Sequence, residues 1–167
     1  DIALRAARLA GKRLLLGGPV PTEPGAQEFF KAEVQPALDR GEANWLGPLD
    51  DAAKQSLLGN AEALLFPIRW DEPFGLVMTE ALACGTPVIA TRRASTPEVI
   101  RDGITGYLCY PAEPDAQAFA HAIRRLPALD RAQCRLDVEQ RFGVEGIAQR
   151  LLDALQTLVA GKSTSPA

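Results

Sequence analysis

Short apolar runs alternate along the chain with stretches in which apolar residues recur at helical spacing. The runs Leu14-Leu15-Leu16 and Val88-Ile89-Ala90 lack the apolar-polar alternation of a half-exposed strand. Such runs indicate strands that are covered on both faces. The strands predicted in this way span residues 13–16, 43–46, 63–66, 87–91 and 106–110.

Helical patterns separate these strands and follow the last one. Strands that alternate with helices predict a parallel sheet, because each connection has to cross back over the sheet. We therefore expect an α/β fold with a Rossmann-like, doubly wound parallel sheet. The predicted helices span residues 2–11, 26–39, 50–58, 75–84, 96–101, 114–126, 130–140 and 144–158.

The length and composition fit one globular domain. A chain of 167 residues buries roughly 70% of its unfolded surface, and 47% hydrophobic with 23% charged residues is ordinary for a folded protein. We expect residues 1–160 to form one domain and the polar segment 161–167 to be a disordered tail.

The charge and the cysteines narrow the function classes. A net charge of −3 with scattered basic residues gives no support for binding nucleic acid. The three cysteines, Cys84, Cys109 and Cys134, have no metal-binding spacing and suggest a reducing compartment. No apolar run approaches the length of about 20 residues that spans a bilayer, and the N-terminus lacks a signal-peptide layout. These features predict a cytoplasmic protein.

Glu72 and Glu80 carry the most specific chemical signal. Residues 73–91 contain a single charged side chain, Glu80, and Glu72 lies just before them. An ionised carboxylate without partners is costly in an apolar environment, so these residues need a specific role. Each also has a structural explanation: Glu72 could favour the dipole of a helix N-terminus, and Glu80 could pair with a distant arginine.

The helix that follows Glu72 provides a complementary site. Its first amides, those of Gly75, Leu76 and Val77, lack partners within the helix and favour an anion such as phosphate. Carboxylates beside them would accept hydrogen bonds from sugar hydroxyls. A nucleotide sugar supplies both kinds of group.

Three segments resemble a known family. The segment EPFGLVMTEALACGTPVIA, residues 72–90, is similar to the signature of family 4 glycosyltransferases, the retaining GT-B enzymes, and its two glutamates match their E-x7-E motif. The segments STPEVIRDGITGYL, residues 95–108, and WLG, residues 45–47, match the same family. The resemblance covers nearly the whole chain.

The resemblance implies a role for each matching residue. Glu72 would hold hydroxyls of the donor sugar and act as the catalytic residue, whereas Glu80 would hold the ribose. The diphosphate would lie against the amides of the loop after Glu72 and of the first helical turn. The base would lie against a segment after the second strand, and a glycine loop would line the same cleft. The remaining donor-binding candidates are Phe74, Gly75, Leu76 and Val77 for the diphosphate, Leu49 for the base, and Gly17 and Gly18 in the glycine loop.

The resemblance also implies what the chain lacks. It matches the C-terminal, donor-binding half of a GT-B fold, with the N-terminal acceptor domain absent. The family's basic residues that neutralise the diphosphate follow the first strand of this half, which we expect before Asp1. We therefore expect the chain alone to bind donor weakly and to transfer nothing. Transfer would need no metal and no other cofactor, and the resemblance leaves open a peripheral membrane association of the whole enzyme.

Two other functions compete with a glycosyltransferase. One is a non-catalytic module of the same fold that binds a nucleotide sugar or a protein partner. The other is an enzyme that binds NAD or uses a phosphate loop, since the sheet topology is shared. Its motifs, G-x-G-x-x-G and G-x-x-x-x-G-K-[ST], do not follow any predicted strand.

Overall fold

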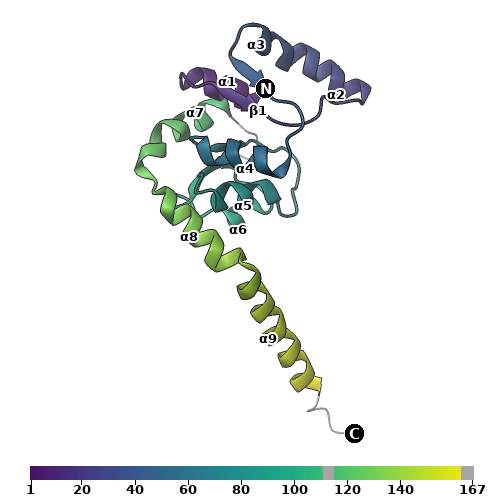
Figure 1. Cartoon of the computed structure of the whole chain (residues 1–167), viewed down its shortest axis with the longest axis vertical. Coiled ribbons are helices and arrows are strands. Elements are labelled where there is room, and N and C mark those ends of the chain that lie inside the picture. The colour runs from purple at the N-terminus through teal and green to yellow at the C-terminus, as the bar shows by residue number, and fades with distance from the viewer. Residues whose placement is uncertain (111–114, 163–167) are drawn as a thin grey trace.

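The structure, a computed structural model, describes residues 1–110 and 115–162 (Figure 1). Helices and strands alternate up to the fifth strand, and helices follow it. All five predicted strands are present within a residue of their predicted ends, which confirms the α/β fold class. The elements are α1 Ile2–Leu9, β1 Leu14–Leu16, α2 Pro24–Phe29, η1 Phe30–Val34, α3 Gln35–Asp39, β2 Ala43–Trp45, α4 Asp51–Asn60, β3 Leu64–Phe66, α5 Leu76–Ala83, β4 Val88–Thr91, α6 Thr96–Val99, β5 Gly106–Cys109, α7 Ala116–Arg125, η2 Leu126–Ala128, α8 Arg131–Phe142 and α9 Val144–Lys162.

The strands pair in parallel but form two sheets. Strand β1 pairs with β2, with Leu15 opposite Asn44. Strand β4 lies between β3 and β5, with Leu65 opposite Ile89. The prediction of a parallel arrangement is therefore confirmed, whereas β1 and β3 are not hydrogen-bonded neighbours in one sheet.

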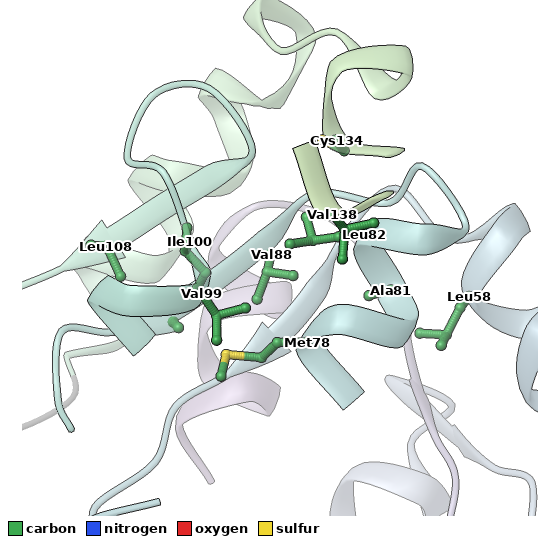
Figure 2. Packing of buried hydrophobic residues seen from close by; sticks show 11 residues of the cluster. Leu58, Met78, Ala81, Leu82, Val88, Val99, Ile100, Leu108, Cys134 and Val138 are labelled. Carbon is green, nitrogen blue, oxygen red and sulfur yellow. The ribbon is translucent and has the colours of Figure 1, made fainter. Parts of the chain in front are cut away.

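Helices cover both faces of the larger sheet. Alternate residues of a strand point to opposite faces, and in β4 Val88 and Ala90 pack with α5, α6 and α8, whereas Ile89 packs with α1 and α7. Figure 2 shows the first of these clusters, in which Met78 and Leu82 of α5 lie against Val88. This two-sided cover explains why the sequence of β4 is apolar without alternation. The same cover was predicted for Leu14-Leu15-Leu16, and there the prediction is wrong, because no residue of β1 is buried and Leu15 is 38% exposed.

Residues 26–39 do not form the one regular helix that was predicted. The structure divides them into α2, the π-helical segment η1 and α3. Pro36 lies in the first turn of α3. Because proline has no N–H and its ring collides with the carbonyl four residues earlier, the hydrogen-bond pattern widens before it.

The C-terminal helix α9 is longer than predicted and leads away from the sheets (Figure 1). It includes Gly161 and Lys162, which were predicted to belong to the disordered tail. The rest of that tail, residues 163–167, and the predicted start of a helix at Pro114 lie outside the described residues. Among the helices of the described chain, none is long and apolar enough to cross a membrane.

The cysteines should differ in reactivity. Burial raises the pKa of Cys109 to about 12 and that of Cys134 to about 11, and a thiol reacts as the thiolate. Cys84 is half-buried. We expect a thiol-specific disulfide reagent at about pH 8 to titrate one thiol per folded chain and all three after unfolding. Fast labelling that persists in Cys84→Ser would contradict this assignment.

Candidate functional site

The N-terminus of α5 lies at the end of the loop that follows β3. The helix begins at Leu76, one residue later than predicted, and Gly75 is its N-cap in a left-handed conformation with φ of 76°. A Cβ on Gly75 would lie 2.7 Å from Cε of Met78, a residue of the core. Only glycine therefore fits this cap without strain or displacement of the core.

Glu72 is fixed by two hydrogen bonds. Its Oε1 accepts the Gly75 N–H at 3.1 Å, and its Oε2 accepts the Trp70 Nε1–H at 3.0 Å. Each carboxylate oxygen can accept a further bond, so the oriented carboxylate keeps acceptor capacity for a ligand. The structure also corrects one expectation, because the Gly75 amide is bonded to Glu72. Within the part of the chain that the structure describes, the amides of Leu76 and Val77 donate no hydrogen bond, so these two are the open amides at this end of α5.

Phe74 contributes only its main chain to this region. Its ring packs edge-on against Phe142, with the centroids 5.7 Å apart, at the margin of the core cluster. Its carbonyl accepts the Ser95 Oγ–H at 3.1 Å, and the Ser95 N–H reaches the carbonyl of Glu72 at 3.4 Å. Ser95 thus fastens the loop that carries Glu72 to the segment after β4.

Glu80 lies on α5 and pairs across to α4. The Lys54 Nζ donates to Glu80 Oε1 at 2.7 Å and lies 3.4 Å from Oδ1 of Asp51. The hydrogen bond to Glu80 raises the pKa of Lys54. From the sequence, one explanation of Glu80 was a pair with a distant arginine. The partner is instead a lysine, Lys54. Lys54 was missed from the sequence, although its place in the first turns of the helix that follows Leu49, the candidate for contact with the base, was a usable signal.

Arg93 is a second cation that sequence reasoning treated as part of a scattered set. It follows β4, and its Nε donates to Oδ1 of Asp71 at 2.7 Å, next to Glu72 in the chain. Loops at the carboxyl ends of parallel strands are where such folds bind ligands. The position of Arg93 directly after a predicted strand was a signal that could have identified it as a site residue.

The remaining candidates lie on the smaller sheet. Gly17 follows β1, and a Cβ placed on it would lie 2.6 Å from Cδ1 of Leu49, so these two residues are neighbours. The Gly18 N–H donates to the carbonyl of Gly47 at 2.8 Å. The structure therefore places the glycine loop, Gly17 and Gly18, beside the segment after β2 that contains Gly47 and Leu49. Helix α4, which starts just after Leu49, connects this group to Glu80 through Lys54.

The family of this chain follows from a match to the model of the glycosyl transferases group 1, which extends over residues 4–140. The chain belongs to this family. The predicted fold class, the Rossmann-like half of a GT-B glycosyltransferase, is confirmed by this family and by the similar solved structures.

Two curated relatives and two solved structures illustrate the similarity. The chain is 34% identical over 128 residues to the D-inositol 3-phosphate glycosyltransferase of Mycobacterium bovis (strain BCG / Pasteur 1173P2), covering 74% of this chain and 26% of the relative. It is 41% identical over 78 residues to the phosphatidyl-myo-inositol mannosyltransferase of Mycobacterium tuberculosis (strain CDC 1551 / Oshkosh), covering 47% of this chain and 21% of the relative.

Among solved structures, the chain is similar to Anabaena HepE in complex with UDP and glucose, with 25% identity and a TM-score of 0.73 over 93% of this chain and 44% of that one. It is also similar to sucrose-phosphate synthase from Thermosynechococcus elongatus, with 30% identity and a TM-score of 0.72 over 96% of this chain and 42% of that one. The chain thus spans less than half the length of these proteins.

Proposed function

We propose that this chain is the donor-binding domain of a retaining glycosyltransferase that takes a sugar from a nucleotide-diphosphate sugar. The observation that carries the proposal is the orientation of Glu72 at the open amides of α5. A carboxylate and a helix N-terminus side by side suit a sugar next to a phosphate. Binding of UDP and glucose by the similar Anabaena protein supports the same class of ligand.

Each part of the site has a distinct role in this proposal. The amides of Leu76 and Val77, with the positive end of the helix dipole, receive the diphosphate. Glu72 accepts hydrogen bonds from hydroxyls of the donor sugar, and Glu80 accepts them from the ribose. Lys54, already paired with Glu80, holds that carboxylate in place and adds positive charge beside the nucleotide.

The transfer step needs more than this domain. Departure of a nucleoside diphosphate is favoured mainly by electrostatic stabilisation and positioning, and we propose that this enzyme achieves it without a metal or other cofactor. The acceptor would lie on an N-terminal domain, and the basic residues facing the diphosphate would precede Asp1. The 167-residue chain is therefore expected to bind donor weakly and to transfer nothing.

Calorimetric titration of the chain with UDP-, GDP- and ADP-sugars, and with NAD, tests the proposal. Binding of a nucleotide sugar, with weaker binding of the other nucleotides, supports it. Strong binding of NAD without binding of any nucleotide sugar would overturn it. The non-catalytic alternative is tested separately by joining an acceptor domain to the N-terminus and measuring transfer.

Trp70 should matter for the sugar and not for the nucleotide. The change Trp70→Phe removes the N–H that orients Glu72 and keeps an aromatic ring. Because this bond to the carboxylate is exposed to water and acts on the sugar only through the orientation of Glu72, we expect the affinity for the nucleotide sugar to fall about 2- to 5-fold. Affinity for the nucleoside diphosphate alone, measured by the same titration, should be unchanged. A parallel loss for both ligands would contradict the assigned role.

A further inference from the structure

Two segments that follow the neighbouring strands β3 and β4 meet beside Glu72. Residues 67–75 connect β3 to α5, and residues 92–95, the β4 turn, connect β4 to α6. Three hydrogen bonds join these segments: Arg93 Nε donates to Oδ1 of Asp71 at 2.7 Å, Ser95 Oγ donates to the carbonyl of Phe74 at 3.1 Å, and the Ser95 N–H donates to the carbonyl of Glu72 at 3.4 Å. The β4 turn thus holds the loop before, at and after Glu72.

The β4 turn is itself fixed to the core of the protein. Thr96 is fully buried, and its hydroxyl oxygen accepts the Arg93 N–H at 3.0 Å and donates to the carbonyl of Thr91 at 2.7 Å. Thr91 ends β4, the middle strand of the larger sheet. Ser95 is also buried, whereas residues 69–71 of the facing loop are exposed. The turn can therefore serve as a fixed support for the loop that carries Glu72.

The backbone of the β4 turn is strained at one residue. Ala94 has φ of 47°, and in the described part of the chain it is the only residue other than glycine with a positive φ. A side chain makes this conformation unfavourable, and such a residue persists only where its surroundings hold it. Ala94 separates Arg93 from Ser95, and both of these neighbours bind the loop. The strain is thus located where the turn holds the loop.

The position of the Glu72 carboxylate depends on this support. Trp70 and Gly75 orient the carboxylate, but both belong to the same loop as Glu72. Their hydrogen bonds fix the carboxylate within the loop and do not fix the loop relative to the sheet. The bonds from the β4 turn do so. A movement of the loop away from the turn would therefore carry the oriented carboxylate with it.

The pair between Arg93 and Asp71 is better suited to positioning than to stabilising the fold. The side chain of Asp71 is 77% exposed and that of Arg93 is 32% exposed. Ion pairs this exposed contribute little to stability. A misplacement of about 1 Å in an active site, by contrast, can lower activity by about 100-fold. The pair therefore matters chiefly through what it places, and the residue that follows Asp71 is Glu72.

We propose that Arg93 is a positioning residue of the donor-sugar site, which holds the loop of Glu72 in place through Asp71. Arg93 acts through this carboxylate and not by touching the ligand. The inference rests on the proposed function, because that function gives Glu72 the hydroxyls of the donor sugar. Without the pair, the two bonds from Ser95 are left to hold the loop, and Glu72 would meet the sugar in a wider range of positions.

The indole N–H of Trp70 reports on the loop without any ligand, because it donates to Glu72. The chain has two tryptophans, and the indole signal that Trp70→Phe removes from the NMR spectrum is that of Trp70. In Arg93→Gln we expect this signal to shift and its exchange with solvent to become at least about 3-fold faster. Ala94→Val places a β-branched residue at a positive φ and should shift the signal in the same direction without removing a charge.

A matched control lies on α8. Arg135 Nε donates to Oε1 of Glu139 at 2.7 Å, the same distance as from Arg93 Nε to Asp71. Arg135→Gln therefore removes an equivalent contact away from the loop, and we expect it to leave the Trp70 signal unchanged.

Calorimetric titration separates positioning from folding. We expect Arg93→Gln and Asp71→Asn each to lower the affinity for the nucleotide sugar by about 2- to 5-fold, the effect of losing an exposed pair. The affinity for the nucleoside diphosphate should not change. The double variant should lose no more than either single variant, because the two residues act as one unit. The melting temperatures should stay within about 2 °C of the wild type.

Three results would overturn the proposal. An unchanged Trp70 signal in Arg93→Gln would show that the pair does not hold the loop. Equal loss of the nucleotide sugar and the nucleoside diphosphate would show a general effect on the domain. Losses that add in the double variant would show that the two residues act separately, for example by touching the ligand. If the wild-type chain binds no nucleotide sugar, the proposed function fails instead, and the Trp70 signal alone decides whether Arg93 holds the loop.

Discussion

Replacing Glu80 by alanine is expected to weaken binding of the nucleoside diphosphate itself by about 10- to 100-fold. Hydrogen bonds from ribose hydroxyls to a carboxylate are charge-assisted and contribute about 1.5 to 3 kcal/mol when shielded from water, and each 1.4 kcal/mol or so corresponds to tenfold in affinity. The loss should be the same for the nucleotide sugar, because the ribose is common to both ligands. Titration calorimetry with the two ligands measures it.

A matched variant separates this effect from the loss of a surface ion pair. Glu139 pairs with Arg135 at 2.7 Å on α8, the same distance as between Glu80 and Lys54. Glu139→Ala removes an equivalent contact outside the candidate site, and we expect no change in affinity. If Glu139→Ala and Glu80→Ala lower the affinity for the nucleotide by the same factor, Glu80 has no specific role in binding it.

Glu72 provides the contrasting variant in the same experiment. Glu72→Gln keeps an oxygen that can accept the Gly75 N–H but loses the charge that strengthens a bond from a sugar hydroxyl. We expect the sugar-bearing donor to lose affinity while the nucleoside diphosphate does not. Equal loss of both ligands in both variants would show that the roles assigned to Glu72 and Glu80 are wrong.

The strands could be predicted from the sequence because they are apolar on both faces. The run Val88-Ile89-Ala90 has no polar residue that a helix or a loop would place in water, and the structure buries it fully. The interruption of the helix around Pro36 was not predicted, although proline cannot continue the regular bond pattern. The division into two sheets was not predicted either, because no sequence pattern records that β1 and β3 are not hydrogen-bonded to each other.

Within the candidate site, local sequence placed Glu72, Gly75 and the first amides of α5 together, because they lie within one loop and one helical turn. Contacts between distant elements escaped prediction. Lys54 and Glu80 are 26 residues apart and meet only because α4 packs on α5. The hydrogen bond from Trp70 to Glu72 depends on a side-chain rotamer, which no sequence pattern records.

Gly106→Ala is expected to destabilise the fold by about 3 kcal/mol or more, at the upper end of the range for overpacking. Gly106 lies in β5 opposite Val88, and a Cβ on it would lie 1.9 Å from the carbonyl oxygen of Val88. This obstacle is backbone and not the end of a flexible side chain, so β4 and β5 would have to separate. The larger sheet positions the segments that carry Glu72 and Ser95. Separation of these strands would therefore also displace those two segments.

The glycine of α4 supplies the control with the opposite sign. Gly59 has open space around its Cα and lies in the last turn of α4, so Gly59→Ala should stabilise the chain slightly, by at most about 1 kcal/mol, through helix propensity. Thermal unfolding followed by circular dichroism should therefore show a melting temperature lowered by about 6 to 12 °C for Gly106→Ala and slightly raised for Gly59→Ala. A Gly106→Ala chain that melts with the wild type would mean that β5 can move away from Val88 at little cost, and the close approach of these strands would then not stabilise the sheet.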